Sequence, residues 1–142
     1  MKNLFALALC VLVLGGVGCG GSGPVREAAD IDVPALMEQL RSSDASAREL
    51  ACIELSKGLE TAAPALDALI ELVKSDKESR VREMAAYAIY EMGPEVGKAA
   101  MPMIKERWDK ERSQGVRSVL LNLWNQIEPD SSPVNQNRAK QP

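Results

Sequence analysis

The chain has 142 residues, of which 46% are apolar and 26% charged, which is ordinary for one globular domain. Its formal net charge of −3 gives no electrostatic basis for binding nucleic acid, which requires a basic surface. The sequence contains no histidine, so the commonest general base and metal ligand is absent, and no cysteine pair has the spacing of a zinc site. We therefore expect a protein that is not an enzyme, with no cofactor, no metal and no nucleic-acid partner.

An export signal is predicted at residues 1–18. Lys2 supplies a positive charge, and residues 4–14 form an unbroken apolar run of eleven residues. That run is shorter than the roughly 18 apolar residues that a membrane-spanning helix needs, and glycines follow it. We expect the protein to be exported to the cell envelope or periplasm and not to span the membrane.

The end of this signal, Gly16-Val17-Gly18-Cys19, resembles the lipobox of bacterial lipoproteins, in which the cysteine is lipidated and becomes the mature N-terminus. Gly18 and Cys19 match that pattern, whereas Gly16 stands where the pattern usually has leucine. Residues 19–31 begin with a Gly/Ser-rich run that suits a flexible tether. The resemblance implies a membrane anchor through lipid on Cys19. The alternative is an ordinary cleaved signal and a soluble exported protein.

The middle of the chain repeats itself. Arg48, Arg82 and Arg117 recur at intervals of 34 and 35 residues. A proline precedes each arginine by 14, 18 and 15 residues respectively, and we interpret the extra four residues of the middle unit as one additional helical turn. A fixed period in this range is typical of arrays of helix pairs. Residues 32–128 are therefore predicted to form one repeat domain.

Each repeat is predicted to contain two helices. Apolar residues recur at helical spacing on both sides of a short polar break. Asp44, Asp76 and Ser113 lie in these breaks and are predicted to cap the N-termini of the second helices. Gly58 and Gly93 are predicted to end the first two of these helices. Because no such pair buries its apolar face alone, the stacked units are expected to share one core.

Three further features can be read from the sequence. Cys52 and Trp124 fall at positions that predict core side chains, and Leu50 is among the apolar residues of the same predicted helix as Cys52. The alternating charges of residues 105–112 predict a solvated surface. Residues 129–142 are polar, contain three prolines and are predicted to be a disordered tail.

The succession of Pro-Ala-Leu, a polar turn with Asp, Val-Arg, paired alanines and a closing glycine resembles the HEAT repeat. The likeness is greatest to the short bacterial form also found in phycobilisome lyase subunits. It covers residues 33–127 and is closest in the middle unit. The resemblance implies an all-α fold, namely a short right-handed α-solenoid of about three HEAT-like helix pairs. It also implies that Arg48, Arg82 and Arg117 contact adjacent units and bind no ligand.

In arrays of this family the second helices line the concave side, and their outward positions form the usual binding surface. Tyr87 and Tyr90 are candidates for an interaction hot spot, since rigid aromatic groups supply contact area at low entropy cost. The alternative is that Tyr90 packs against the neighbouring unit with only its hydroxyl exposed. The partner-binding residues that the resemblance implies are Ile53, Glu83, Tyr87, Tyr90, Glu91, Asn122 and Asn125.

Two functions of different classes remain open at this point. The first is a non-enzymatic module or scaffold that binds another protein at the cell envelope and is held at the membrane through Cys19. The second is a lyase-like or cofactor-handling protein, which kinship with bilin lyase subunits implies. Those subunits are intracellular, so the export signal argues against the second function.

Overall fold

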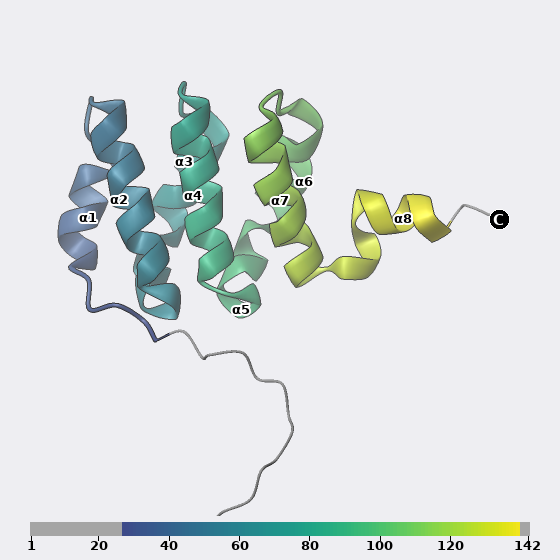
Figure 1. The fold of residues 1–142 in the computed structure, drawn as a ribbon, viewed down its shortest axis with the longest axis horizontal. Helices are drawn as coiled ribbons and strands as arrows, with labels where there is room; N and C mark the ends of the chain where they lie inside the picture. The colour runs from purple at the N-terminus through teal and green to yellow at the C-terminus, as the bar shows by residue number, and fades with distance from the viewer. Residues whose placement is uncertain (1–26, 140–142) are drawn as a thin grey trace, which may run out of the picture.

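The computed structural model describes residues 27–139, which form an all-α array (Figure 1). The predicted signal, Cys19 and most of the predicted tether lie outside the described residues. The α-helices are α1 (Val33–Gln39), α2 (Ala45–Lys57), α3 (Leu66–Ser75), α4 (Ser79–Glu91), α5 (Pro94–Gly97), α6 (Met101–Lys110), α7 (Gln114–Ile127) and α8 (Pro133–Ala139). Short 3-10 helices occupy Leu59–Ala65 (η1), Lys98–Ala100 (η2) and Pro129–Ser131 (η3).

The helices form two layers. Figure 1 shows α2, α4 and α7 side by side in one layer, with α1, α3 and α6 in the other. α2 packs along much of α4, and α4 along much of α7, whereas the helices of the other layer contact one another far less. The closer approach of the second helices places them on the inner side of the array. The predicted solenoid of about three helix pairs is confirmed.

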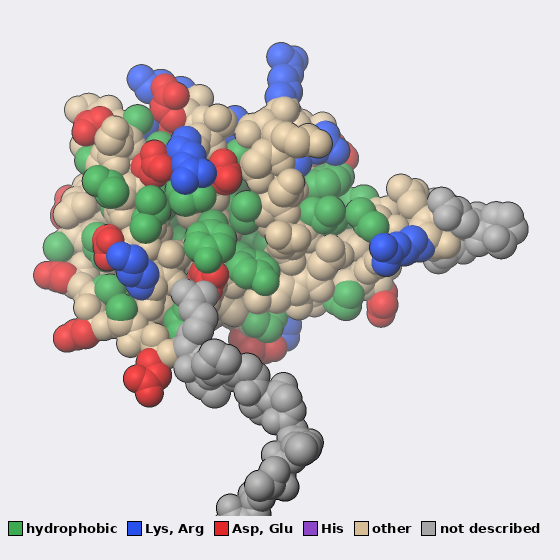
Figure 2. Space-filling view, in the orientation of Figure 1, with side chains coloured by type: hydrophobic (Ala, Val, Ile, Leu, Met, Phe, Trp, Pro, Cys, Tyr) green, Lys and Arg blue, Asp and Glu red, His purple; other side chains and the backbone are tan. Residues whose placement is uncertain are grey.

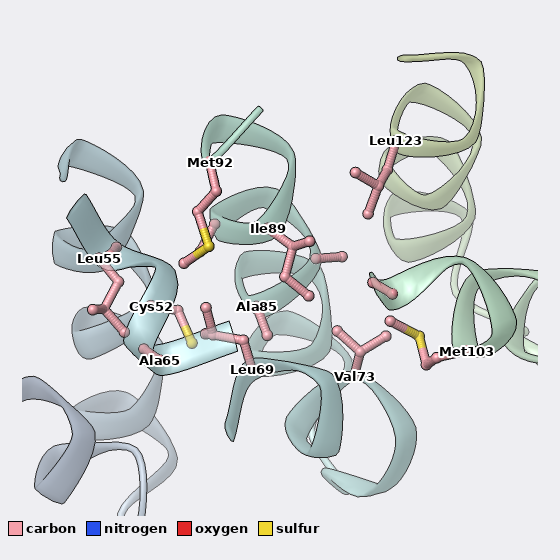
Figure 3. Packing of buried hydrophobic residues seen from close by; sticks show 14 of the residues in the cluster. Cys52, Leu55, Ala65, Leu69, Val73, Ala85, Ile89, Met92, Met103 and Leu123 are labelled. Atoms are coloured by element: carbon pink, nitrogen blue, oxygen red, sulfur yellow. The ribbon is translucent and has the colours of Figure 1, made fainter. Parts of the chain in front are cut away.

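One continuous core runs through all three pairs, from Leu36 in α1 to Trp124 in α7. Figure 3 shows side chains from α2, α3, α4 and α7 meeting in it. Fully buried alanines, including Ala85 and Ala86, let the helices approach closely. Cys52 is also fully buried, and burial raises the pKa of its thiol to about 12, so it is a core residue as predicted.

The turns between paired helices are capped differently from the prediction. Asp44 caps α2 as expected, because its Oδ1 accepts a hydrogen bond from Ser46 N at 3.0 Å. Asp76 lies two positions too early, since Glu78 is the N-cap of α4, although Asp76 Oδ1 accepts from Glu78 N. Ser113 is the N-cap of α7, but its side chain makes no capping hydrogen bond. Glu111 Oε1 accepts from Ser113 N instead, so the longer side chain satisfies this amide.

Gly93 ends α4 as predicted, with φ 85° and ψ 167°, a backbone conformation that essentially only glycine adopts. Gly58 follows α2 with an ordinary φ of −76°, and the residue with positive φ there is Leu59. Gly58 has a different role, because a Cβ at this position would meet Cδ1 at the end of the Ile31 side chain, which would then have to shift. The glycine therefore lets the incoming chain cross the end of α2, where Ala29 N donates to Lys57 O at 2.8 Å.

The additional helical turn predicted for the middle unit is wrong. Helices α3 and α6 both have 10 residues. Pro64 lies inside η1, whereas Pro102 is the second residue of α6, so the two prolines do not occupy equivalent positions. The difference in spacing arises in the connection between the units.

The structure also differs from the predicted disordered tail, since residues 129–139 form η3 and α8. Trp124 Nε1 donates to Ser131 Oγ at 2.9 Å and so fixes η3 against the end of α7. Asn135 Nδ2 donates to Pro129 O at 2.8 Å and holds the start of α8 to η3. Helix α8 extends away from α7 (Figure 1). In the described part of the chain, no helix is long and apolar enough to cross a membrane.

Candidate functional site

Arginine–carboxylate pairs join each unit to the next at the turns; we call these two pairs the arginine ladder. In the first pair, Arg48 Nε donates to Asp76 Oδ2 at 2.7 Å and Nη2 donates to Oδ1 at 3.0 Å. Arg48 Nη1 also donates to Ser42 O at 2.8 Å. The Asp76 side chain is only 4% exposed. Arg48 therefore fixes its own turn and the turn of the following unit.

The second pair repeats this geometry. Arg82 Nε donates to Glu111 Oε2, and Nη2 donates to Oε1, both at 2.9 Å. Arg82 Nη1 donates to Asp76 O at 2.9 Å. Arg107, on the same unit as Glu111, donates to Glu111 Oε2 at 2.8 Å. The predicted contacts of Arg48 and Arg82 with adjacent units are confirmed.

Glu111 is the exception to the predicted solvated run 105–112, because its side chain is only 1% exposed. Burial alone would raise the pKa of this carboxyl, but hydrogen bonds from Arg82, the Ser113 amide and Arg107 outweigh it and lower the pKa to about 2. Burial likewise opposes ionisation of Asp76, and the bonds from Arg48 and the Glu78 amide lower the Asp76 pKa. Both carboxylates are thus charged at neutral pH.

The ladder joins α2, α4 and α7. We call the side of these three helices that points away from the α1, α3 and α6 layer the second-helix face. Tyr87 and Tyr90 lie on α4 in the middle of the array, with ring centroids 6.3 Å apart and ring planes inclined by 23°. Both rings are partly exposed, as is Ile53 on α2. Figure 2 shows hydrophobic side chains gathered near the middle of this face. Tyr90 is partly buried and also packs against the shared core.

Charged groups border the tyrosines toward the turns. Arg80 Nε donates to Glu49 Oε1 at 2.9 Å, and Arg80 Nη1 donates to Glu83 Oε1 at 3.3 Å. Glu83 also lies against Gly115, where an added Cβ would be 2.7 Å from Glu83 Oε2. Glu83, predicted to bind a partner, therefore already contacts its own chain on both sides.

The α7 part of the face is polar. Asn122 is exposed and Asn125 is partly exposed. Asn122 follows Tyr87 by 35 residues, and Tyr87 follows Ile53 by 34, so these three occupy equivalent positions of successive units. The structure thus brings the predicted α2, α4 and α7 residues onto one face. Glu91 lies at the end of α4, partly buried.

Leu50 is one of the apolar residues of the predicted second helix, but it is 58% exposed. Its equivalents Met84 and Val119 pack against the core. Within residues 27–139, no helix pair precedes the first one to cover Leu50. Leu50 adds apolar surface at the N-terminal border of the second-helix face, which the repeat period alone could have indicated.

The other layer is more hollowed. A groove of about 490 Å³ lies between α1 and α3, lined by apolar Met37, Leu40 and Leu72 and by charged Arg41 and Glu71. Among residues 27–139, no group of three or more acidic or cysteine side chains is arranged to hold a metal ion.

Stacked helix pairs that share one core and are linked unit to unit define an α-solenoid, a class that presents an extended surface to its partners. The chain belongs to the HEAT-repeat family, since residues 33–124 match HEAT repeats. Proteins of this family are generally protein-interaction scaffolds and typically non-enzymatic. No curated protein and no solved structure shows a significant match to the chain.

Proposed function

We propose that this chain is a non-enzymatic protein-binding or scaffold module that is exported to the cell envelope, and that it binds its partner on the second-helix face. One observation carries the proposal: three helices linked by a buried ladder present a continuous surface with two stacked tyrosines near its centre. An extended surface of this kind is what helical repeat arrays use to bind protein partners.

Tyr87 and Tyr90 are the proposed anchors of this site. Their stacking restricts both rings before any partner arrives, so little conformational entropy is lost when the partner binds. Ile53 on the neighbouring helix extends the apolar centre. The ion pairs of Arg80 form a polar rim at one end, which matches the arrangement of an apolar centre and polar border found in protein interfaces.

Lipid attachment at Cys19 is part of this proposal, because the lipobox-like sequence and the glycine run precede the array directly. The nine residues from Cys19 to Glu27 are joined by eight peptide links and span at most about 28 Å when fully extended. A chain anchored through Cys19 would therefore hold Glu27 within about that distance of the membrane. Mass spectrometry of the mature N-terminus from native membranes tests this part: an unmodified Cys19, or cleavage elsewhere, would contradict it.

The binding site is tested by affinity capture from envelope extract, followed by calorimetric titration of the partner that is recovered. We expect the double variant Tyr87→Ala/Tyr90→Ala to weaken binding at least about tenfold, or about 1.4 kcal/mol. The matched control is Glu71→Ala/Lys74→Ala, which removes an exposed ion pair on α3 of the other layer. Circular dichroism must show that both variants keep their helical content.

Unchanged affinity of the tyrosine variant, or equal loss in the control, would contradict the assignment of the second-helix face. The absorbance spectrum of the protein purified from its native source distinguishes the cofactor-handling alternative from the proposed protein-binding role. A chromophore that co-purifies in stoichiometric amount would favour that alternative over a purely protein-binding role.

A further inference from the structure

Each second helix has one stripe of residues, spaced by four, that faces the following unit. On α2 the stripe is Arg48, Cys52 and Ser56, and all three are buried by the middle unit. On α4 it is Arg82, the fully buried Ala86 and the partly exposed Tyr90, and the last unit provides the carboxylate that pairs with Arg82. In both units the arginine meets a carboxylate of the next turn, and a small side chain meets the next helix.

The same stripe on α7 consists of Arg117, Leu121 and Asn125, which we call the C-terminal end face. All three are partly exposed, unlike the buried residues at the same positions of α2. Within the described residues, Arg117 has no carboxylate partner, and its guanidinium lies 4.5 Å from the centroid of the Trp108 ring. Asn125 Oδ1 is buried and has no hydrogen-bond partner in the described part of the chain. Within residues 27–139, this face therefore has the arginine of a unit-to-unit contact but no following unit to pair with it.

Helix α8 follows α7 but does not take that place. It packs on η3 and extends away from the body of the array (Figure 1). η3 contacts the C-terminal end of α7 through Trp124 and Ser131, away from the turn in which Arg117 lies. Neither η3 nor α8 therefore occupies the place beside Arg117 that the carboxylate of a following unit's turn would take.

The opposite end of the array is finished differently. The ladder carboxylates Asp76 and Glu111 each lie six residues before an arginine, and the equivalent residue of the first unit is Ser42. Glu54 on α2 replaces the fully buried Ala88 and Leu123, and it pairs with Lys57 at 2.6 Å. Polar end groups of this kind keep the first unit soluble. They also leave the first unit without the carboxylate that Arg117 would need, so a second copy stacked in line cannot continue the ladder.

We propose that the C-terminal end face docks a helix pair of another protein, which stacks on α7 as a further unit and places an aspartate or glutamate of its turn against Arg117. The geometry of the two existing pairs specifies the polar contact, namely a bidentate bond from Nε and Nη2 of Arg117, while Leu121 offers a larger apolar side chain than Cys52 or Ala86 at the same position. The exposed Arg112 beside this turn adds positive charge that favours an acidic partner turn. This surface borders the second-helix face at Asn125, whereas Arg117 and Leu121 are not among the residues of that face.

The test uses the full chain in its native cells with the photoreactive amino acid benzoylphenylalanine at position 121. We expect a crosslink to one protein, at a helix pair whose turn contains Asp or Glu. The matched control carries the same photoreactive group at position 54 on the capped end, where no such crosslink should form. Arg117→Met should reduce the crosslink at least tenfold, and Arg117→Glu should abolish it.

Charge exchange completes the test. When the contacting carboxylate of the recovered protein is changed to arginine, the crosslink to the Arg117→Glu chain should return. Absence of a crosslink from position 121, a crosslink to a second copy of the chain, or failure of the charge exchange would each overturn the proposal. The crosslink should persist in the Tyr87→Ala/Tyr90→Ala variant, because both tyrosines lie on α4 and not on the C-terminal end face, and its loss would also overturn the proposal.

Discussion

Replacing Arg82 by methionine tests the arginine ladder most directly. The substitution keeps an unbranched apolar side chain, so most of the packing of the Arg82 stem is preserved. It removes both bonds to Glu111, whose side chain is 1% exposed, and the bond to Asp76 O. The variant thus leaves a buried carboxylate with fewer partners, at the contact between the second and third units.

The expected magnitude follows from the partners that remain. Removing one member of a buried ion pair typically costs about 3–5 kcal/mol, because the other charge stays buried. Glu111 keeps two bonds from Arg107 and those from the Arg112 and Ser113 amides, so its charge is still partly compensated. We therefore expect Arg82→Met to lower the free energy of unfolding by about 2–3 kcal/mol, a large part of the about 5–15 kcal/mol available to a typical domain.

The assay is urea unfolding at pH 7, followed by circular dichroism. Arg80→Met is the matched control, since it makes the same change two residues away on α4 in a side chain that is 56% exposed. Exposed ion pairs contribute about 1 kcal/mol or less, so the control should unfold close to the original chain. Equal destabilisation by the two variants would refute the reasoning, because burial of the carboxylate would then not determine the cost.

Three further predictions follow from the same structure. The carboxyl of Glu111 has a folded pKa of about 2 against an ordinary value of 4.5, so its ionised form adds about 3 kcal/mol to the free energy of unfolding. This contribution is complete above pH 4.5 and is lost as the pH falls toward 2. Glu111→Gln should therefore flatten the dependence of the unfolding free energy on pH in that window, and an unchanged slope would contradict the assignment. Gly93→Ala should cost about 1–3 kcal/mol in thermal or urea unfolding, entirely from backbone strain, since an added Cβ meets nothing within 4 Å. The Cys52 thiol should resist iodoacetamide at pH 8 in the folded chain and react once urea unfolds it; fast labelling of the folded form would show that α2 opens readily.

The fold was accessible from the sequence because its determinants are local and periodic. The interval between arginines, the small apolar residues of the second helices and the glycine after α4 each encode a repeated local structure. The tyrosine pair was accessible for the same reason, since residues three apart on a helix are neighbours.

The ladder carboxylate of the third unit was not accessible in this way. Glu111 lies in a run of alternating charges, and nothing within the run distinguishes it from its exposed neighbours. Its burial depends on Arg82, 29 residues away in the sequence. Only alignment of the units on their arginines places Glu111 in the position of Asp76. The helical tail escaped prediction for a similar reason, because the Trp124 indole that fixes it belongs to the preceding helix.

The ladder also bears on how such a chain can lengthen. Each of the last two units offers a carboxylate to the unit before it and an arginine to the unit after it, whereas the first unit has Ser42 in place of the carboxylate. Tandem duplication of the middle unit within the gene would therefore insert a segment whose two junctions are already matched in charge. Duplication of the first unit would create a junction in which an arginine meets a serine. Growth of the array from its interior thus needs no compensating mutation, and growth from its N-terminal end does.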